Sequence, residues 1–209
     1  MDRRVFLTTV GLAGAAAGTG VTLKARAAGG FDPTEKSIAA LAEAMRTGET
    51  TSVQLVRAYT ARIERFERGA EGLYSVIAIN PTAEAEAAAL DKERRGGHVR
   101  GPLHGIPVLL KDNIETAGAL PTTAGSHALA RSTHQKPADL VARLEAAGAV
   151  ILGKANLSEW ANFRCNRSSS GWSGVGGQTG NAYDRRRNPS GSSSGSGAAA
   201  AASFCAAAV

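Results

Sequence analysis

The segment from Asn188 to Gly197 combines many hydroxyl groups with almost no side-chain bulk, a composition that suits chemistry better than packing. It reads Asn-Pro-Ser-Gly-Ser-Ser-Ser-Gly-Ser-Gly and leads into an alanine-rich stretch, Ala198 to Val209, that predicts an apolar helix. Small residues at a loop-to-helix junction let the backbone approach a reacting group, while serine hydroxyls donate and accept hydrogen bonds. A flexible glycine/serine linker has the same composition, so this segment alone leaves both interpretations open.

A phosphate-binding loop is a third interpretation of the glycine-rich segments, and the spacing disfavours it. A Walker A loop needs Lys followed by Ser or Thr after its last glycine, whereas Ala198 and Ala199 follow Gly197 here. The run from Gly174 to Gly180 also misses the dinucleotide-binding pattern, because Thr179 stands where the third glycine belongs.

A lysine at the end of a predicted strand supplies a second reactive group. The apolar run from Val108 to Leu110 is typical of a strand covered on both faces, and Lys111 follows it directly. Burial disfavours the charged form of a lysine and lowers its pKa. A surface lysine that opens a turn is the ordinary alternative. With a serine-rich loop downstream, a neutral Lys111 acting as a base toward a serine becomes a candidate for the chemistry.

These two segments together resemble the amidase signature family of serine hydrolases, which use a Ser–cis-Ser–Lys triad. The segments Gly153–Ala161, Ser170–Ser173 and Asp184–Pro189 fit the same family pattern. The resemblance covers roughly Ser37 to Val209. It is closest to the peptide-amidase-like branch, and the A-type protein of the glutamyl-tRNA amidotransferases is a more distant relative.

The resemblance implies a role for each matching residue. Lys111 is implied as the catalytic lysine and Ser192 as the cis-serine, with a cis peptide between Gly191 and Ser192 and with Ser193 as a supporting hydroxyl. The nucleophilic serine and the oxyanion-hole amides are expected just past Val209. We therefore expect residues 28–209 to be the N-terminal portion of an amidase domain whose C-terminal part is missing, inactive by itself.

The implied reaction is acyl transfer from an amide to water. Neutral Lys111 would take a proton from Ser192, which would take one from the nucleophilic serine. The expected substrate is a small-molecule or peptide amide, and no metal or organic cofactor is implied. Two other classes stay open: a non-catalytic remnant or scaffold protein, and the A-type component of a glutamyl-tRNA amidotransferase.

Residues 1–27 have the pattern of a twin-arginine export signal. An arginine pair lies within Asp2–Leu7, a mildly apolar stretch follows over Val10–Leu23, and Ala25–Ala27 predicts cleavage before Ala28. The apolar stretch is too short and too rich in glycine to span a membrane comfortably. The predicted location is periplasmic or secreted, which argues against a tRNA-linked enzyme.

Charge, cysteines and histidines limit the other partners. The net charge of +6 falls to about +3 without residues 1–27, which hold four basic residues and one acidic one. The densest remaining basic run, Arg185–Arg187, has no interleaved aromatic residues, so nucleic-acid binding is not expected. We expect Cys165 and Cys205 to be two unpaired thiols. Metal-ligand spacing is also missing among the histidines, which are His98, His104, His127 and His134.

The elements that must position these groups follow an α/β pattern. Helices are expected over Lys36–Arg46, from Thr51 to near Gly69 and over Asp139–Ala147. Asn80-Pro81 is expected to cap a further, alanine-rich helix that runs to Arg94. Strands are expected over Ser75–Asn80, Gly105–Lys111 and Ala149–Leu152. This alternation predicts a mainly parallel mixed sheet covered by helices on both sides. The segment from Arg164 to Ser190 has little periodicity and is predicted to be a functional loop.

Overall fold

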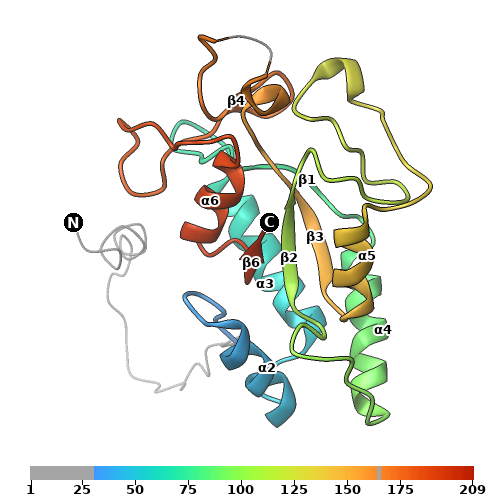
Figure 1. Cartoon of the computed structure of the whole chain (residues 1–209). Coiled ribbons are helices and arrows are strands. Elements are labelled where there is room, and N and C mark those ends of the chain that lie inside the picture. The colour runs from blue at the N-terminus through green and yellow to red at the C-terminus, as the bar shows by residue number, and fades with distance from the viewer. Residues whose placement is uncertain (1–30, 164–165) are drawn as a thin grey trace, which may run out of the picture.

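The main sheet of this protein has four strands in the order β1-β3-β2-β6 (Figure 1). The strand β2 (Pro107–Lys111) pairs in parallel with β3 (Val150–Ala155) and with β6 (Ala207–Ala208), while β1 (Val76–Ile79) pairs antiparallel with β3. The computed structural model describes residues 31–163 and 166–209, so the predicted export signal and Cys165 lie outside the described residues. The prediction of a mainly parallel mixed sheet is confirmed.

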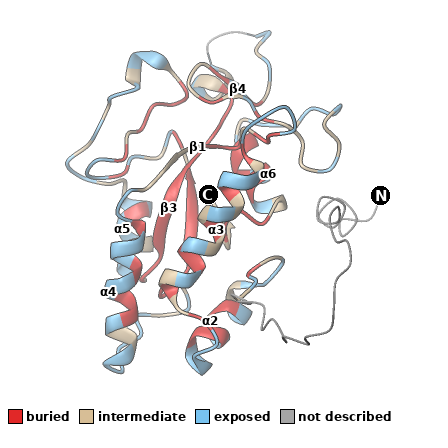
Figure 2. Ribbon diagram, turned by 180° about the vertical axis from the view of Figure 1, so that it is seen from behind, coloured by how far each residue is buried: buried red, intermediate tan, exposed pale blue. Residues whose placement is uncertain are grey.

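Consecutive apolar residues explain why β2 and β3 lie at the centre of the fold. Val108, Leu109 and Leu110 in β2, and Val150 and Leu152 in β3, are all buried. A strand that is apolar at successive positions presents side chains to both faces of the sheet, so both faces need cover. Figure 2 shows these central strands as buried residues enclosed by the helices.

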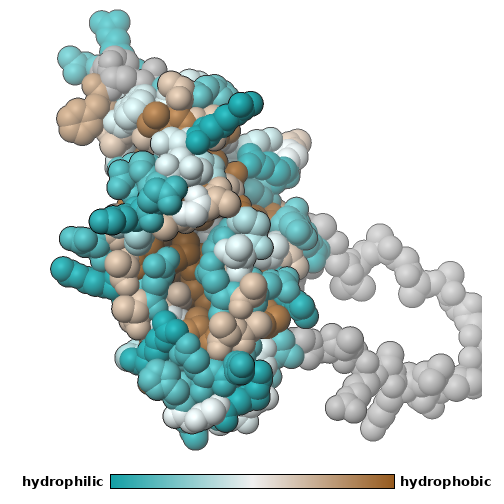
Figure 3. All heavy atoms as spheres, turned by 90° about the vertical axis from the view of Figure 1, so that its right-hand side faces the viewer, coloured by the Kyte–Doolittle hydropathy of each residue, from teal (hydrophilic) through white to brown (hydrophobic). Residues whose placement is uncertain are grey.

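Within the described residues, the cover comes from α3 (Ser52–Phe66), α4 (Ala83–Arg95), α5 (Asp139–Ala146) and α6 (Ser194–Ala201), and α2 (Ile38–Thr47) adds Leu41 and Met45 to the same core. The helices α3 and α4 pack against each other; α3 contacts β2, and α4 contacts β3. The helix α5 also contacts β3, and α6 contacts all four strands. On the side of α4 and α5, hydrophilic side chains cover most of the surface, with apolar atoms visible between them (Figure 3). None of the helices in the described part of the chain is long and apolar enough to cross a membrane.

Side-chain caps explain where the first two helices begin. The hydroxyl of Ser37 accepts a hydrogen bond from Ala40 N (3.2 Å) at the start of α2. At the start of α3, Thr51 and Gln54 form a capping box, in which each side chain bonds the other residue's backbone N–H. Both helices therefore begin within two residues of the predicted positions, although α3 ends at Phe66, before the glycine expected to stop it.

The start of α4 differs from the prediction in one detail. Asn80 does not cap this helix; its N-cap residue is Thr82, which makes no side-chain cap bond. The side-chain oxygen of Asn80 accepts hydrogen bonds from both the backbone N–H (3.0 Å) and the hydroxyl (2.8 Å) of Thr82. Asn80 therefore builds the turn that precedes the helix, a common use of this residue type.

The alanine-rich stretch is helical only in its first part, so the prediction of a helix from Ala198 to Val209 is wrong. The helix α6 begins earlier, at Ser194, and ends at Ala201. The guanidinium of Arg62 binds the carbonyl oxygens of Ala202 and Ser203, and Ser203 adopts a left-handed backbone conformation (φ 55°). The chain then turns back to add β6 to the sheet. Alanine carries no periodic signal, so a run of alanines does not distinguish a helix from a buried strand.

The segment before the serine-rich loop holds a small hairpin, formed by β4 (Trp172–Ser173) and β5 (Gly177–Gln178). A short 3-10 helix, η1 (His127–Leu129), lies in the loop after β2, and a turn of left-handed backbone, η2 (Glu159–Asn162), follows β3. These irregular segments gather beyond the carboxyl ends of β2 and β3 (Figure 1). This is the edge at which parallel α/β sheets commonly carry ligand sites.

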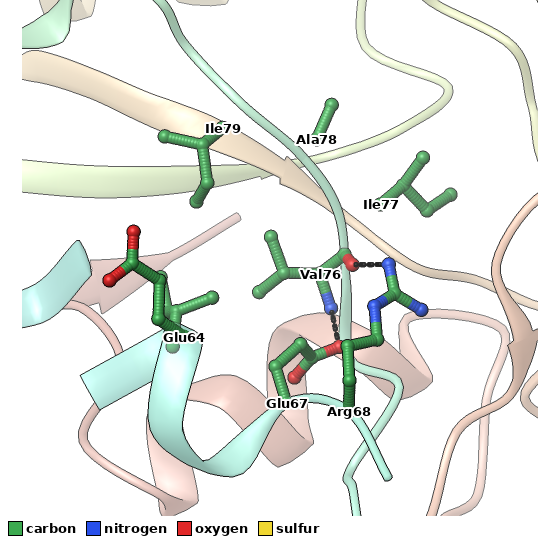
Figure 4. A pocket seen from close by; sticks show the side chains of 8 residues that line it. Glu64, Glu67, Arg68, Val76, Ile77, Ala78 and Ile79 are labelled. Carbon is green, nitrogen blue, oxygen red and sulfur yellow. Dashed lines mark hydrogen bonds between the residues drawn. The ribbon is translucent and has the colours of Figure 1, made fainter. Parts of the chain in front are cut away.

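The outer edge of β1 is occupied by side chains from the end of α3. Buried Glu67 accepts hydrogen bonds from Val76 N (2.7 Å) and Ser75 Oγ (2.8 Å), and Arg68 Nη2 donates to Val76 O (3.1 Å; Figure 4). Burial raises the pKa of the Glu67 carboxyl. These side chains border a surface pocket that contains neither of the two residues predicted to be catalytic.

Candidate active site

The lysine and the serine singled out in the sequence lie in contact. Lys111 Nζ is 2.7 Å from Ser192 Oγ, although 81 positions separate the two residues along the chain. Lys111 is the last residue of β2, and Ser192 lies in the loop that leads into α6. The sheet and the helix therefore place a lysine amine and a serine hydroxyl within one hydrogen bond of each other.

The surroundings of Lys111 favour its neutral form. Burial lowers the pKa of its amine, and its side chain is half-buried at the end of a covered strand. The backbone of Lys111 is fixed, because its N–H donates to Val209 O (2.7 Å) and the next N–H, of Asp112, donates to Ala155 O (3.0 Å). A partly desolvated lysine on a rigid strand is suited to accept a proton from a neighbouring hydroxyl.

The serine-rich loop gives its members different environments. The peptide between Gly191 and Ser192 is cis, as the resemblance implied. Ser192 is half-buried and faces Lys111, while Ser193 is exposed and takes the N-cap position of α6 without a side-chain cap bond. Ser194 is buried, and its Oγ donates to Ser190 O (2.5 Å). The structure thus brings together Lys111 and Ser192, with Ser193 as their exposed neighbour.

The chain just after β3 holds this loop in place, a function that the sequence did not reveal. The N–H of Ser158 donates to Ser192 O (2.9 Å), and Gly195 N donates to Asn156 O (2.9 Å). The side-chain amide of buried Asn156 reaches the hairpin, donating to Gly177 O (3.1 Å). Asn156 and Ser158 belong to a segment that supported the resemblance, but they carried no separate signal.

A second buried lysine lies on β3, next to the strand that carries Lys111. Lys154 is fully buried, and its Nζ donates to Ile114 O (2.6 Å) and Thr122 Oγ1 (2.8 Å). Its Nζ also lies 3.7 Å from Asp112 Oδ1. Burial lowers the pKa of Lys154 to about 8 and raises the pKa of Asp112. This pair joins β3 to the loop that follows β2, so its position indicates a structural role beside the candidate site.

The remaining predicted features lie outside this site. Cys205 is buried as a free thiol, with its pKa raised to about 12 by burial. Arg185 donates to Gly72 O, while Arg186 and Arg187 pair with Asp184. Across residues 31–163 and 166–209, the structure shows no group of three His, Cys, Asp or Glu side chains placed to hold a metal ion.

Comparison with known proteins gives consistent matches. The family model described as Amidase matches residues 54–209. A putative amidase of Arthroderma benhamiae is 43% identical over 148 residues, which cover 71% of this chain and 24% of the relative. The A-type component of the glutamyl-tRNA(Gln) amidotransferase of Deinococcus radiodurans is 40% identical over 158 residues, 76% of this chain and 30% of the relative.

The solved structures agree with these matches. Native peptide amidase from Stenotrophomonas maltophilia is 52% identical and superimposes with a TM-score of 0.81, covering 84% of this chain and 36% of that one. An amidase family protein from Bacillus anthracis is 39% identical with a TM-score of 0.80, covering 84% and 35%. The chain spans about a quarter to a third of the length of these curated relatives and solved structures.

Proposed function

This chain belongs to the amidase family, and we propose that it supplies the lysine and the cis-serine of an enzyme that hydrolyses carbon–nitrogen amide bonds. The observation that carries the proposal is the 2.7 Å contact between Lys111 Nζ and Ser192 Oγ. Because the chain covers 24% of one curated relative and 36% of a solved peptide amidase, the activity is proposed for the whole protein. The nucleophilic serine and the oxyanion-hole amides are proposed to come from polypeptide outside these 209 residues. The 209 residues alone would then be inactive.

The proposed reaction is a proton relay coupled to acyl transfer. Lys111, whose pKa is lowered by partial burial, accepts the proton of Ser192 Oγ in its neutral form, while that oxygen accepts the proton of the nucleophilic serine. The nucleophile's oxygen attacks the amide carbonyl and forms a tetrahedral adduct. The proton returns through Ser192 to the leaving nitrogen, and the amine departs. Water then repeats these steps on the acyl-enzyme.

The substrate proposed here is a small-molecule or peptide amide. The 52% identity to a peptide amidase supports this choice. A second candidate is the A-type component of an amidotransferase, which the 40% identity to the Deinococcus radiodurans protein favours. The proposed location is periplasmic or secreted, through the export signal in residues 1–27, and that location favours the first candidate.

The test is steady-state hydrolysis of a C-terminally amidated peptide by the full-length protein. Lys111→Ala and Ser192→Ala are expected to lower kcat by about 10²–10⁴-fold, because each removes one proton carrier. Lys111→Arg is expected to fail as well, since a guanidinium does not give up its proton. The matched controls are Lys136→Ala and Ser132→Ala, which lie outside the contact described above.

Near-normal turnover by both Lys111→Ala and Ser192→Ala would show that the triad assignment is wrong. Ammonia transfer from glutamine to glutamyl-tRNA, without peptide-amide hydrolysis, would establish the second candidate.

A further inference from the structure

A buried serine that the proposed chemistry does not use holds the loop that carries Ser192. The side chain of Ser158 is fully buried. Its backbone N–H donates to Ser192 O (2.9 Å), and its Oγ accepts a hydrogen bond from Gly171 N (2.9 Å). One residue therefore joins the cis-serine loop to the chain just before β4.

Gly191 packs directly against the Ser158 hydroxyl. A Cβ placed on Gly191 would lie 2.7 Å from Ser158 Oγ and 2.9 Å from Ser194 Oγ, closer than real Cβ atoms come to their neighbours. Gly191 does not have a positive φ, so the backbone conformation is not what favours glycine at this position. The position favours glycine because two hydroxyl oxygens fill the space that a side chain would need.

Ser158 and Lys111 are positioned by the same pair of strands. Lys111 pairs with Ala155 in the register of β2 and β3, and Ser158 follows Ala155 by three positions. The bond from Asp112 N to Ala155 O (3.0 Å) fixes the two strand ends to each other. A contact made by Ser158 therefore helps to fix the position of the cis-serine loop (residues 190–194) relative to Lys111.

We propose that Ser158 is a positioning residue for the reaction: its contacts with Gly191 and Ser192 fix the position of the cis-serine loop, and with it the distance between Ser192 Oγ and Lys111 Nζ. This inference rests on the proposed function, since Ser158 would act on the reaction only through Ser192. Catalytic geometry is sensitive to such a contact, since a misplacement of about 1 Å lowers a rate by roughly 10²-fold. Without the hydroxyl, the loop has room to move toward Ser158 and away from Lys111.

The test compares two buried serines in the full-length protein. Ser158→Ala is expected to lower kcat for a C-terminally amidated peptide by about 10–100-fold, with KM changed by less than about threefold. The acidic limb of the rate profile should also move to higher pH, because loosening the loop hydrates Lys111 and weakens the desolvation that lowers its pKa. The control is Ser52→Ala. Ser52 is equally buried and its Oγ also fills the space that a Cβ on a glycine (Gly105) would need, but that Oγ donates to Met45 Sδ (3.5 Å) and to no residue of the 190–194 loop. That control is expected to lower the melting temperature and to leave kcat and the acidic limb unchanged.

A double-mutant cycle tests the same contact from the side of the loop. Gly191→Ala is expected to lower kcat, and the loss should be smaller in a Ser158→Ala background, where the nearer of the two clashing oxygens is gone. The proposal is overturned if Ser158→Ala keeps the kcat and the acidic limb of the wild type. It is also overturned if kcat and the acidic limb shift equally in Ser52→Ala, or if the effects of Ser158→Ala and Gly191→Ala on kcat are additive. Should Ser158→Ala not fold, an unchanged kcat in Gly191→Ala overturns the proposal, and a reduced kcat with an unchanged KM supports it.

Two further variants separate this inference from the proposed function. If Lys111→Ala and Ser192→Ala are inactive while Ser158→Ala and Gly191→Ala are unaffected, only the positioning role fails. If Lys111→Ala and Ser192→Ala retain turnover, the proposed function fails and the positioning role falls with it.

Discussion

Lys154 Nζ lies 3.7 Å from Asp112 Oδ1, and both side chains are at most 1% exposed. The pair connects the residue next to Lys111 with the neighbouring strand β3. Asp112 Oδ2 also accepts hydrogen bonds from the hydroxyl and the N–H of Thr123, and Lys154 binds the carbonyl of Ile114. The loop after β2 is therefore anchored by two charged groups that solvent does not reach.

Removing one partner of this pair is expected to destabilise the protein strongly. Lys154→Met should lower the free energy of unfolding by about 3–5 kcal/mol, because it leaves a buried carboxylate without its cation. Adding Asp112→Asn should recover part of that loss. Urea unfolding of the full-length protein measures both changes, with Lys92→Met on the exposed side of α4 as the control. A loss in Lys154→Met no larger than in Lys92→Met would contradict the prediction.

The same lysine is expected to make stability depend on pH. Its folded pKa of about 8 is below the ordinary value of 10.5, so between these values the unfolded chain binds more protons than the native protein. The contribution of this group to stability therefore rises with pH across that window. The wild type should gain stability relative to Lys154→Met between pH 8 and pH 10. A difference in unfolding free energy that stays constant over this range would exclude the expected titration.

The pH dependence of the reaction should reflect the lowered pKa of Lys111. A lysine that accepts a proton must first be neutral, so kcat/KM should rise with pH through an acidic limb that lies below 10.5. Activity should be present above this limb and lost as the pH falls through it. Lys111→Arg should show no such limb. A limb at or above the ordinary lysine value would be inconsistent with partial burial of the amine.

Two glycines of α6 should respond to alanine in opposite ways. A Cβ on Gly195 would meet the backbone of Asn156 and Ser75 at less than 3.0 Å, and a backbone cannot move aside as a side chain does. Gly195→Ala should therefore destabilise the protein and displace the start of the helix. Gly197 has nothing within 4 Å of its Cβ position, so Gly197→Ala should stabilise the helix by about 0.5–1 kcal/mol. Thermal unfolding distinguishes the two, and equal effects would argue against this packing of α6.

Asp91 is expected to contribute stability without affecting catalysis. Its buried carboxylate accepts hydrogen bonds from Ser52 N (2.8 Å) and Val53 N (3.1 Å), two N–H groups at the start of α3. Asp91→Ala should lower the free energy of unfolding by about 0.5–2 kcal/mol, as removal of other helix caps does. Asp139→Ala, at an exposed first-turn position of α5, serves as the control. A change in kcat with unchanged stability would contradict this role.

Strong local signals made most of the fold predictable from the sequence. The apolar run before Lys111 identified a central strand, and Thr51 marked the start of α3. The alanine-rich stretch could not be divided correctly, because its side chains give no period. The turn at Ser203 depends on Arg62, which lies 141 positions earlier in the chain.

Within the candidate site, Lys111 and Ser192 were identified through motifs, whereas their supports were not. Ser158 acts through a backbone bond and a contact with a glycine, and neither leaves a pattern in sequence spacing. Lys154 did carry a signal, since it follows the apolar run of β3 much as Lys111 follows that of β2. Each of these lysines follows an apolar run, so burial is expected for both. Only the structure separates them, because the side chain of Lys111 meets a serine hydroxyl of the loop and that of Lys154 is enclosed.

The side chains along the outer edge of β1 have a consequence for how molecules of this protein meet in solution. A strand with free N–H and C=O groups can pair with a strand of another molecule, and repeated pairing leads to aggregation. At Val76, Glu67 already occupies the N–H and Arg68 the carbonyl. A foreign strand would have to displace both side chains and leave the buried carboxylate without one of its partners. At Val76, this edge of the sheet is therefore closed to a pairing strand by the two residues that directly follow α3.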